Sequence, residues 1–283
     1  VLGAGANAIP AFTAISVAGS DVFLSGRTTV QYPVRPAGGV AVINEISNPA
    51  FLGSASGNAQ AQDLIREHLR AAGFDSANLF ESDVAVASRA AVDNNAAYSN
   101  AFASAPAIGG FPAGNTLATQ LRTVAQTISI RPALGASRQI FLVSIGGFDT
   151  HSGQAGTLQA LQTQVSQAIA AFFSATVSLG VADRVTLFTA SDFGRTLTPN
   201  GDGTDHGWGG HHLVVGGAVN GRQIYGAVPP PEITHNQSAQ SGQLIPVTAV
   251  EQYAATLGAW FGLDAPALSQ ALPNLASFSG RPA

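Results

Sequence analysis

The sequence predicts the α/β class, with a mostly parallel sheet. Short apolar runs at 139–145, 184–190 and 213–215 have the length and composition of buried strands. A long segment with helical period, 157–179, separates the first two runs. The order strand, helix, strand is typical of a parallel unit, in which a helix crosses from one strand to the next.

The other expected elements flank these runs. Residues 14–18 and 22–25 alternate around Gly19 as in a hairpin, and 35–57 is a loop rich in Gly, Pro, Ser and Asn. A further short strand is expected at 223–225. Helical spacing of apolar residues predicts four more helices, at 60–72, 82–103, 115–130 and 247–261. We therefore expect one α/β domain over 1–283, with an irregular hairpin and loop region at 1–57 and the core strands and site loops at 138–226.

Composition excludes several classes of protein. Charged residues make up 10% of the chain, against about 25% in an ordinary soluble domain. The 12 basic residues are all arginines and are scattered, whereas a nucleic-acid-binding protein needs a basic stripe. No apolar stretch approaches the roughly 20 residues of a membrane span. The absence of cysteine excludes disulfides and thiolate ligands. With so little charge, we expect an extracellular surface or one covered by partners.

Four of the six histidines lie between residues 147 and 212, in clusters flanked by glycine and rich in aspartate. Carboxylate with neutral imidazole is a ligand set that suits zinc and similar divalent metals. Asp149 and His151 directly follow the first apolar run, and Asp192 and Arg195 follow the second. Ligands of open α/β sheets bind beyond the carboxyl ends of strands, so we expect these clusters to meet at one edge.

Each cluster also has a structural interpretation. Asp149 and His151 could be two metal ligands, or one ligand and the residue that supports it. The structural alternative is an Asx turn in which Asp149 caps the next helix. Asp192 and Arg195 form either part of a site or an ordinary salt bridge. The third cluster is a Gly-rich loop that is either a site or surface decoration; it contains Asp205, His206, His211 and His212.

Other catalytic signatures are weak. The Asp-Phe-Gly at 192–194 lacks the phosphate loop and catalytic loop of a protein kinase, and the chain has no lysine, so we reject that interpretation. No Gly-x-Ser-x-Gly elbow is present, so a Ser-His-Asp hydrolase stays open without an assigned nucleophile. We expect His68 and His235 to be structural.

Three motifs in order, at 145–151, 189–195 and 203–207, followed by glycine-rich segments at 216–217 and 221–226, resemble the bacterial domain-of-unknown-function 1501 family (DUF1501). Residues 15–26 are also similar to a segment of those proteins. The resemblance implies a three-layer, alkaline phosphatase-like sandwich, with a sheet between two layers of helices. It also implies export, usually by a twin-arginine signal, to the periplasm or the cell surface.

The same resemblance implies roles for individual residues. Asp149 and His151 would be one pair of metal ligands, Asp192 the Asp of an Asp-His pair, and His206 or His211 the late histidine ligand; we add Asp205 as a further candidate. Phe193 stands where the alkaline phosphatase and sulfatase superfamily, to which the resemblance points, has a metal-binding histidine. We therefore expect at most one metal within this chain. The chain has no initiating Met and no counterpart of the family's N-terminal portion. We therefore expect a C-terminal portion, partnered by the missing portion or by another chain.

The leading functional expectation is an exported, metal-dependent hydrolase of phosphate or sulfate esters. A divalent metal, zinc among the candidates, would activate the ester, while Arg195 would grip its anionic group. The alternative is a non-catalytic component of a surface assembly that keeps the fold.

Overall fold

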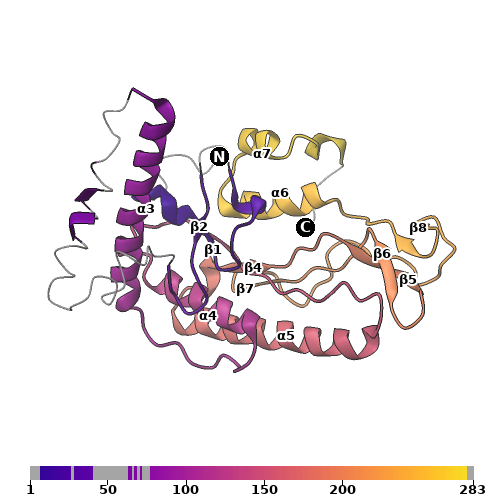
Figure 1. Cartoon of the computed structure of the whole chain (residues 1–283). Helices are drawn as coiled ribbons and strands as arrows, with labels where there is room; N and C mark the ends of the chain where they lie inside the picture. The colour runs from indigo at the N-terminus through magenta and orange to yellow at the C-terminus, as the bar shows by residue number, and fades with distance from the viewer. Residues whose placement is uncertain are drawn as a thin grey trace. The chain divides into compact units, whose positions relative to one another are not determined.

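A computed structural model describes residues 7–26, 29–40, 63–65, 67–68, 71 and 77–278 (Figure 1). The chain divides into two compact units, an N-terminal unit (Ala4–Ser144) and a C-terminal unit that contains Ile145–Ala283. Most of the loop expected at 35–57 and most of the helix expected at 60–72 lie outside the described residues.

The N-terminal unit contains a three-stranded parallel sheet. Strand β1 (Ala14–Ser16) lies in the middle, between β2 (Tyr32–Pro33) and β3 (Ile140–Leu142). Its register places Ile15 opposite both Tyr32 and Phe141. Parallel strands joined by helices confirm the α/β class, and β3 confirms the first predicted strand.

The hairpin expected over 14–25 is wrong. β1 pairs in parallel with β2, and the second half of the expected hairpin is a 3-10 helix, η2 (Val22–Leu24). The Asp21 carboxylate accepts a hydrogen bond from the backbone N–H of Phe23, 2.8 Å away. A local bond of this kind offers the backbone an alternative to a strand ladder, which alternation of apolar residues does not reveal.

Two helices of the N-terminal unit confirm the predictions at 82–103 and 115–130, and the described residues 63–65, 67–68 and 71 are also helical. Helix α3 (Leu79–Ala103) begins at Asn78, whose side chain caps the N–H of Phe80, and α4 (Thr116–Ser129) begins at Asn115. The apolar face of α4 is buried at Leu117, Leu121, Val124 and Ile128, at the helical spacing seen in the sequence.

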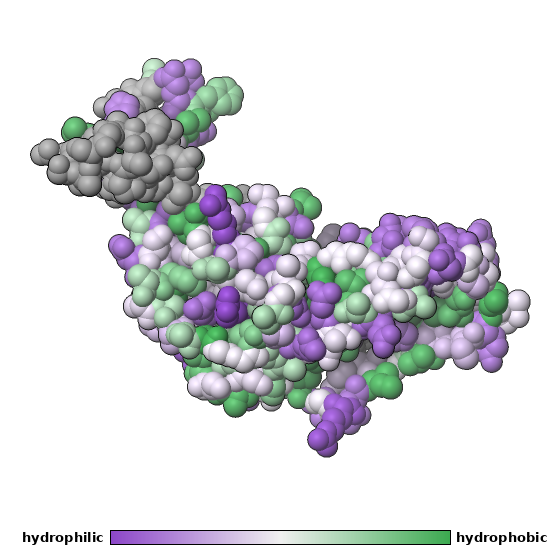
Figure 2. Space-filling model, turned by 60° about the horizontal axis from the view of Figure 1, so that its bottom comes forward, coloured by the Kyte–Doolittle hydropathy of each residue, from purple (hydrophilic) through white to green (hydrophobic). Residues whose placement is uncertain are grey.

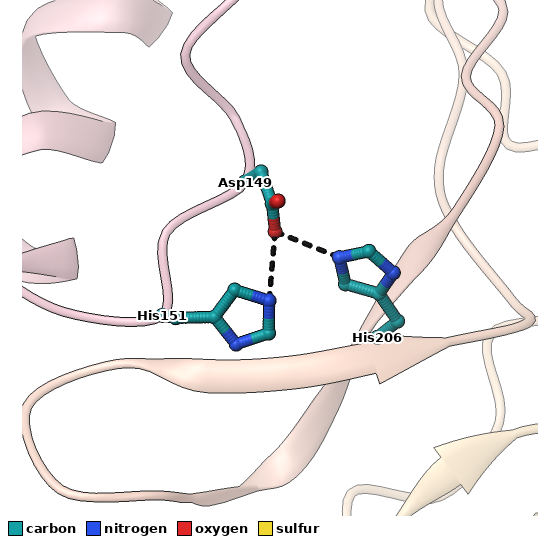
Figure 3. Close-up of side chains that lie close together, drawn as sticks. All are labelled: Asp149, His151 and His206. Atoms are coloured by element: carbon teal, nitrogen blue, oxygen red, sulfur yellow. Dashed lines mark hydrogen bonds and ion pairs between the residues drawn. The ribbon is translucent and has the colours of Figure 1, made fainter.

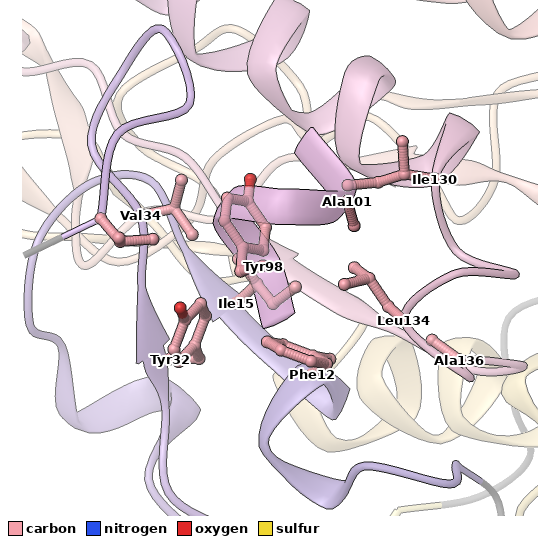
Figure 4. Packing of buried hydrophobic residues seen from close by; sticks show 10 residues of the cluster. Phe12, Ile15, Tyr32, Val34, Tyr98, Ala101, Ile130, Leu134 and Ala136 are labelled. Carbon is pink, nitrogen blue, oxygen red and sulfur yellow. The ribbon is translucent and has the colours of Figure 1, made fainter. Parts of the chain in front are cut away.

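The core of the N-terminal unit is an aromatic cluster between the sheet and α3 (Figure 4). Phe12, in the 3-10 helix η1 (Pro10–Thr13), contacts Tyr32 edge to face at 5.1 Å between ring centroids. The Tyr98 ring is fully buried, and its hydroxyl lies 2.8 Å from the Thr127 hydroxyl. Burial raises the pKa of Tyr98 to about 12, so the phenol stays neutral and the core carries no charge.

The C-terminal unit is organised differently, around antiparallel pairs. β4 (Thr186–Phe188) pairs with β7 (Val214–Gly216), which confirms two predicted strands. Helix α5 (Gln154–Ser178) lies on one side of this pair and α6 (Val250–Phe261) on the other (Figure 1). Tyr253 of α6 packs edge to face on Phe188, and Phe173 of α5 lines a shallow apolar groove with Val215. Helix α7 (Ala265–Ala271) and the 3-10 helices η4 (Ala182–Arg184) and η5 (Leu275–Ser277) complete the helical part.

The predicted parallel relationship between the first two apolar runs is wrong, because β3 and β4 belong to different sheets and β4 pairs antiparallel. Parallel pairing is therefore confined to the N-terminal unit among the described residues. The run at 223–225 is not a strand. Two short pairs lie where loops were expected: β5 (Gly194–Pro199) with β6 (Thr204–Gly207), and β8 (Ser238–Ala239) with β9 (Gln243–Leu244). Strand partners depend on long-range contacts, which hydrophobic pattern does not specify.

The surface follows the low charge of the sequence. On the face in Figure 2, strongly hydrophilic residues are scattered among many residues of intermediate hydropathy. Within the described ranges, no helix combines the length and the apolar character needed to cross a bilayer.

Candidate metal centre

A loop that precedes α5 docks on the turn between β5 and β6. The backbone N–H of Thr204 donates to the Thr150 carbonyl at 3.2 Å, and that of Gln154 donates to the Asp202 carbonyl at 3.1 Å. The approach is close: a Cβ added to Gly203 would lie 2.3 Å from the carbonyl carbon of His151. Glycine is therefore required at 203 for the loop with Asp149 and His151 to reach the hairpin.

The hairpin supplies two more side chains. Arg195 of β5 and His206 of β6 are direct cross-strand partners, so their side chains leave the hairpin side by side. Both reach one carboxylate oxygen, Oδ1 of Asp149: the distance is 2.7 Å from His206 Nε2 and 2.9 Å from Arg195 Nη1. His151 Nε2 lies 3.0 Å from the same oxygen (Figure 3). Three nitrogens from two segments thus converge on a single atom.

The Arg195 guanidinium is held independently of Asp149. Its Nε donates to the Thr204 hydroxyl at 2.9 Å, and its Nη2 donates to the Thr204 carbonyl. The Thr204 hydroxyl donates in turn to Oε1 of Gln154 at 2.8 Å. The Arg195 side chain is 19% exposed, against 55% for Asp149. The guanidinium is therefore the fixed member of this contact.

The two imidazoles are oriented by stacking and by a second carboxylate. The ring of Phe193 stacks on His206 at 4.2 Å with an interplanar angle of 1°, and His206 stacks on His151 at 5.1 Å. The far nitrogen of His151, Nδ1, lies 3.3 Å from Asp205 Oδ1, which accepts a 2.6 Å hydrogen bond from Asn200. A carboxylate behind a histidine fixes the ring and raises its basicity as a ligand.

Electrostatics favour an ionised Asp149. The hydrogen bond from His206 and then that from Arg195 lower the pKa of this carboxyl below its usual value of 3.8. Both bonds favour the charged form. Asp149 is thus an anion across the whole neutral range, as a metal ligand must be.

The donor set fits a divalent cation. Asp149, His151 and His206 each offer one ligand atom, and these atoms all lie within 4.8 Å of one another. Zinc bonds of about 2.0–2.2 Å in a tetrahedron imply ligand atoms about 3.4 Å apart, so Asp149 Oδ1, which lies 2.7 Å from His206 Nε2 and 3.0 Å from His151 Nε2, would move away from both nitrogens. Three ligands leave a fourth position for water or substrate, which is the pattern of a catalytic site.

The remaining predicted residues lie elsewhere in this arrangement. Asp205 stands behind His151, and Asp192 and His211 are exposed residues outside the Asp-His-His group. Of the two other histidines expected to be structural, His68 is exposed, and His235 accepts a hydrogen bond from the Gln237 N–H through Nδ1.

His212, weighed with the third cluster, belongs to a different contact. Its Nδ1 lies 3.3 Å from the Thr189 hydroxyl, and its ring stacks on Tyr253 at 5.9 Å. Burial, followed by the neighbouring His211, lowers the pKa of His212. This histidine therefore links the segment that precedes β7 to the residue that follows β4 and to α6.

Sequence reasoning missed the supporting residues Gln154, Asn200 and Thr204. Thr204 lies within the 203–207 motif but had no assigned role, and Gln154 and Asn200 lie outside the three motifs. The roles of all three arise from the docking of the loop on the hairpin. The glycines around them were the available signal, since close backbone approach is what glycine permits.

These observations define an α/β protein with an exposed group of Asp and His side chains able to hold a metal ion. The chain belongs to the DUF1501 family, described as proteins of unknown function, whose family model matches residues 23–276. No curated protein and no solved structure matches the chain. The match confirms the family suggested by the three motifs. It spans both units, and the single domain expected over 1–283 stays a prediction.

Proposed function

We propose that this protein is an exported, metal-dependent hydrolase of phosphate or sulfate esters, with an alkaline phosphatase-like fold and a divalent cation such as zinc at Asp149, His151 and His206. The observation that carries the proposal is the convergence of three ligand atoms beside a guanidinium. The site thus combines ligands for a cation with a hydrogen-bond donor for an anion. This combination suits a phosphate or sulfate ester, which carries negative charge.

Each side chain has a distinct role in this proposal. A bound divalent cation supplies Lewis-acid polarisation of the ester. With a cation bound, Asp205 would accept the Nδ1 proton of His151 and so leave the Nε2 lone pair for the metal. Phe193 keeps the His206 ring in its plane by stacking. Arg195 presents a planar fork that matches the oxygens of phosphate or sulfate.

The test compares three purified proteins: the parent, His151→Ala, and His68→Ala as an exposed-histidine control. Bound metal is measured by elemental analysis, and hydrolysis with p-nitrophenyl phosphate and p-nitrophenyl sulfate. We expect the parent and His68→Ala to hold about one metal per chain and to hydrolyse one of the esters. His151→Ala should lose both properties. Equal activity in His151→Ala and the parent would refute the proposal.

A second candidate is a non-catalytic component of a surface assembly. The observation in its favour is Phe193, which follows Asp192 and stacks on His206, so no second metal ligand is available at that position. This candidate predicts no ester hydrolysis by the parent. It also predicts that His151→Ala leaves folding and binding to a surface partner unchanged.

A further inference from the structure

Arg195 contacts Asp149 at the oxygen that faces the other two candidate metal ligands. Arg195 Nη1 donates to Oδ1 of Asp149 at 2.9 Å. The same oxygen is the one that His151 and His206 face. A cation bound between these imidazoles through Oδ1 would therefore compete with Arg195 for that oxygen.

The two partners of this contact are held very differently. Arg195 is anchored through Nε and Nη2 to Thr204, and its Cζ lies 5.6 Å from the centre of the Phe193 ring. Asp149 is on a loop, and its side chain is 55% exposed. When Asp149 turns to serve as a ligand, Arg195 stays in place and its Nη1 loses its acceptor. A guanidinium donor without an acceptor, close to a cation site, is a binding group for an oxyanion.

We propose that Arg195 links cation and anion binding: it pairs with Asp149 when the centre holds no metal, and it turns this hydrogen-bonding capacity to a tetrahedral oxyanion when Asp149 binds a divalent cation. This inference rests on the metal centre of the proposed function but not on hydrolysis. Because coupling between two ligands is reciprocal, the anion raises affinity for the cation by the same factor as the cation raises affinity for the anion.

The experiment measures zinc binding by titration calorimetry, with and without sulfate, at matched ionic strength. In the parent protein, sulfate should tighten zinc binding about tenfold, within the usual range of coupling energies. Arg195→Gln removes the competitor, so zinc alone should bind about tenfold more tightly than in the parent, and the effect of sulfate should be lost.

Two further variants make this experiment specific. Arg184→Gln, an arginine on η4 that donates to the Gly180 carbonyl, should behave as the parent does. Arg195→Lys keeps the positive charge but not the two-point grip on Thr204, and should also lose the sulfate effect. It provides the test if Arg195→Gln does not fold.

The outcomes separate the two proposals. Equal zinc affinity and an equal sulfate effect in the parent and both Arg195 variants would overturn the inference. So would absence of zinc binding in the parent and in the Arg195 variants, which would overturn the metal centre as well. Coupling without ester hydrolysis would leave the inference intact and reject only the hydrolase.

Discussion

The two units use their side chains in opposite ways. In the N-terminal unit, large apolar and aromatic residues such as Phe12, Ile15, Tyr98 and Leu134 are completely or almost completely buried. In the C-terminal unit, the candidate metal ligands Asp149, His151 and His206 are exposed. They are positioned by hydrogen bonds between a loop and a hairpin. The difference shows that burial holds the first unit together, while close backbone contact positions the candidate site of the second.

The largest expected effect is on the aromatic core. Tyr98→Ala removes a fully buried ring that contacts Phe12, Tyr32 and Phe102. Truncation of a buried aromatic residue costs about 3–5 kcal/mol of unfolding free energy. Urea unfolding followed by circular dichroism measures this loss. Tyr98→Phe, which removes only the hydroxyl bonded to Thr127, should cost about 1 kcal/mol. Equal unfolding free energies of Tyr98→Ala and the parent would show that this aromatic core does not dominate the stability of the fold.

A single methyl group should disturb the site without disturbing the core. Gly203→Ala places a Cβ against the backbone of Thr150 and His151, which cannot move aside as a flexible side chain would. The loop must leave the hairpin, so zinc affinity should fall at least about tenfold, in line with the loss of a supporting contact. Gly210→Ala is the matched control, because nothing lies within 4 Å of its Cβ position. Unchanged zinc affinity in Gly203→Ala would mean that the loop does not need the hairpin.

The smallest expected effect concerns pH and the exposed Asp149. Its pKa is lowered in the folded protein, so its contacts with His206 and Arg195 stabilise the fold above the unfolded carboxyl pKa of about 3.9. That contribution is lost as pH falls through the lower pKa of the folded state. In zinc-free buffer, Asp149→Asn should lower the urea midpoint slightly at about pH 6, and the two midpoints should converge as pH falls through the lowered pKa of the folded state. A difference that grows on acidification would contradict this sign.

Much of the local structure could be predicted. Helical patterns in the sequence located α3 and α4, and the apolar runs located β3, β4 and β7. The Gly-flanked clusters likewise singled out Asp149, His151, His206 and Arg195 as candidate site residues. These features are local, because the apolar period of a helix involves residues within one or two turns of each other.

Only the tertiary structure decided which of these elements meet. It placed β3 and β4 in different sheets, formed a hairpin from a predicted loop, and left Asp192 and His211 out of the group that Asp149 joins. It also made Arg195 a partner of Asp149 rather than of its neighbour Asp192. The physical reason is that strand pairing and loop docking depend on contacts between residues distant in sequence, such as Thr150 with Thr204, and no short pattern encodes them.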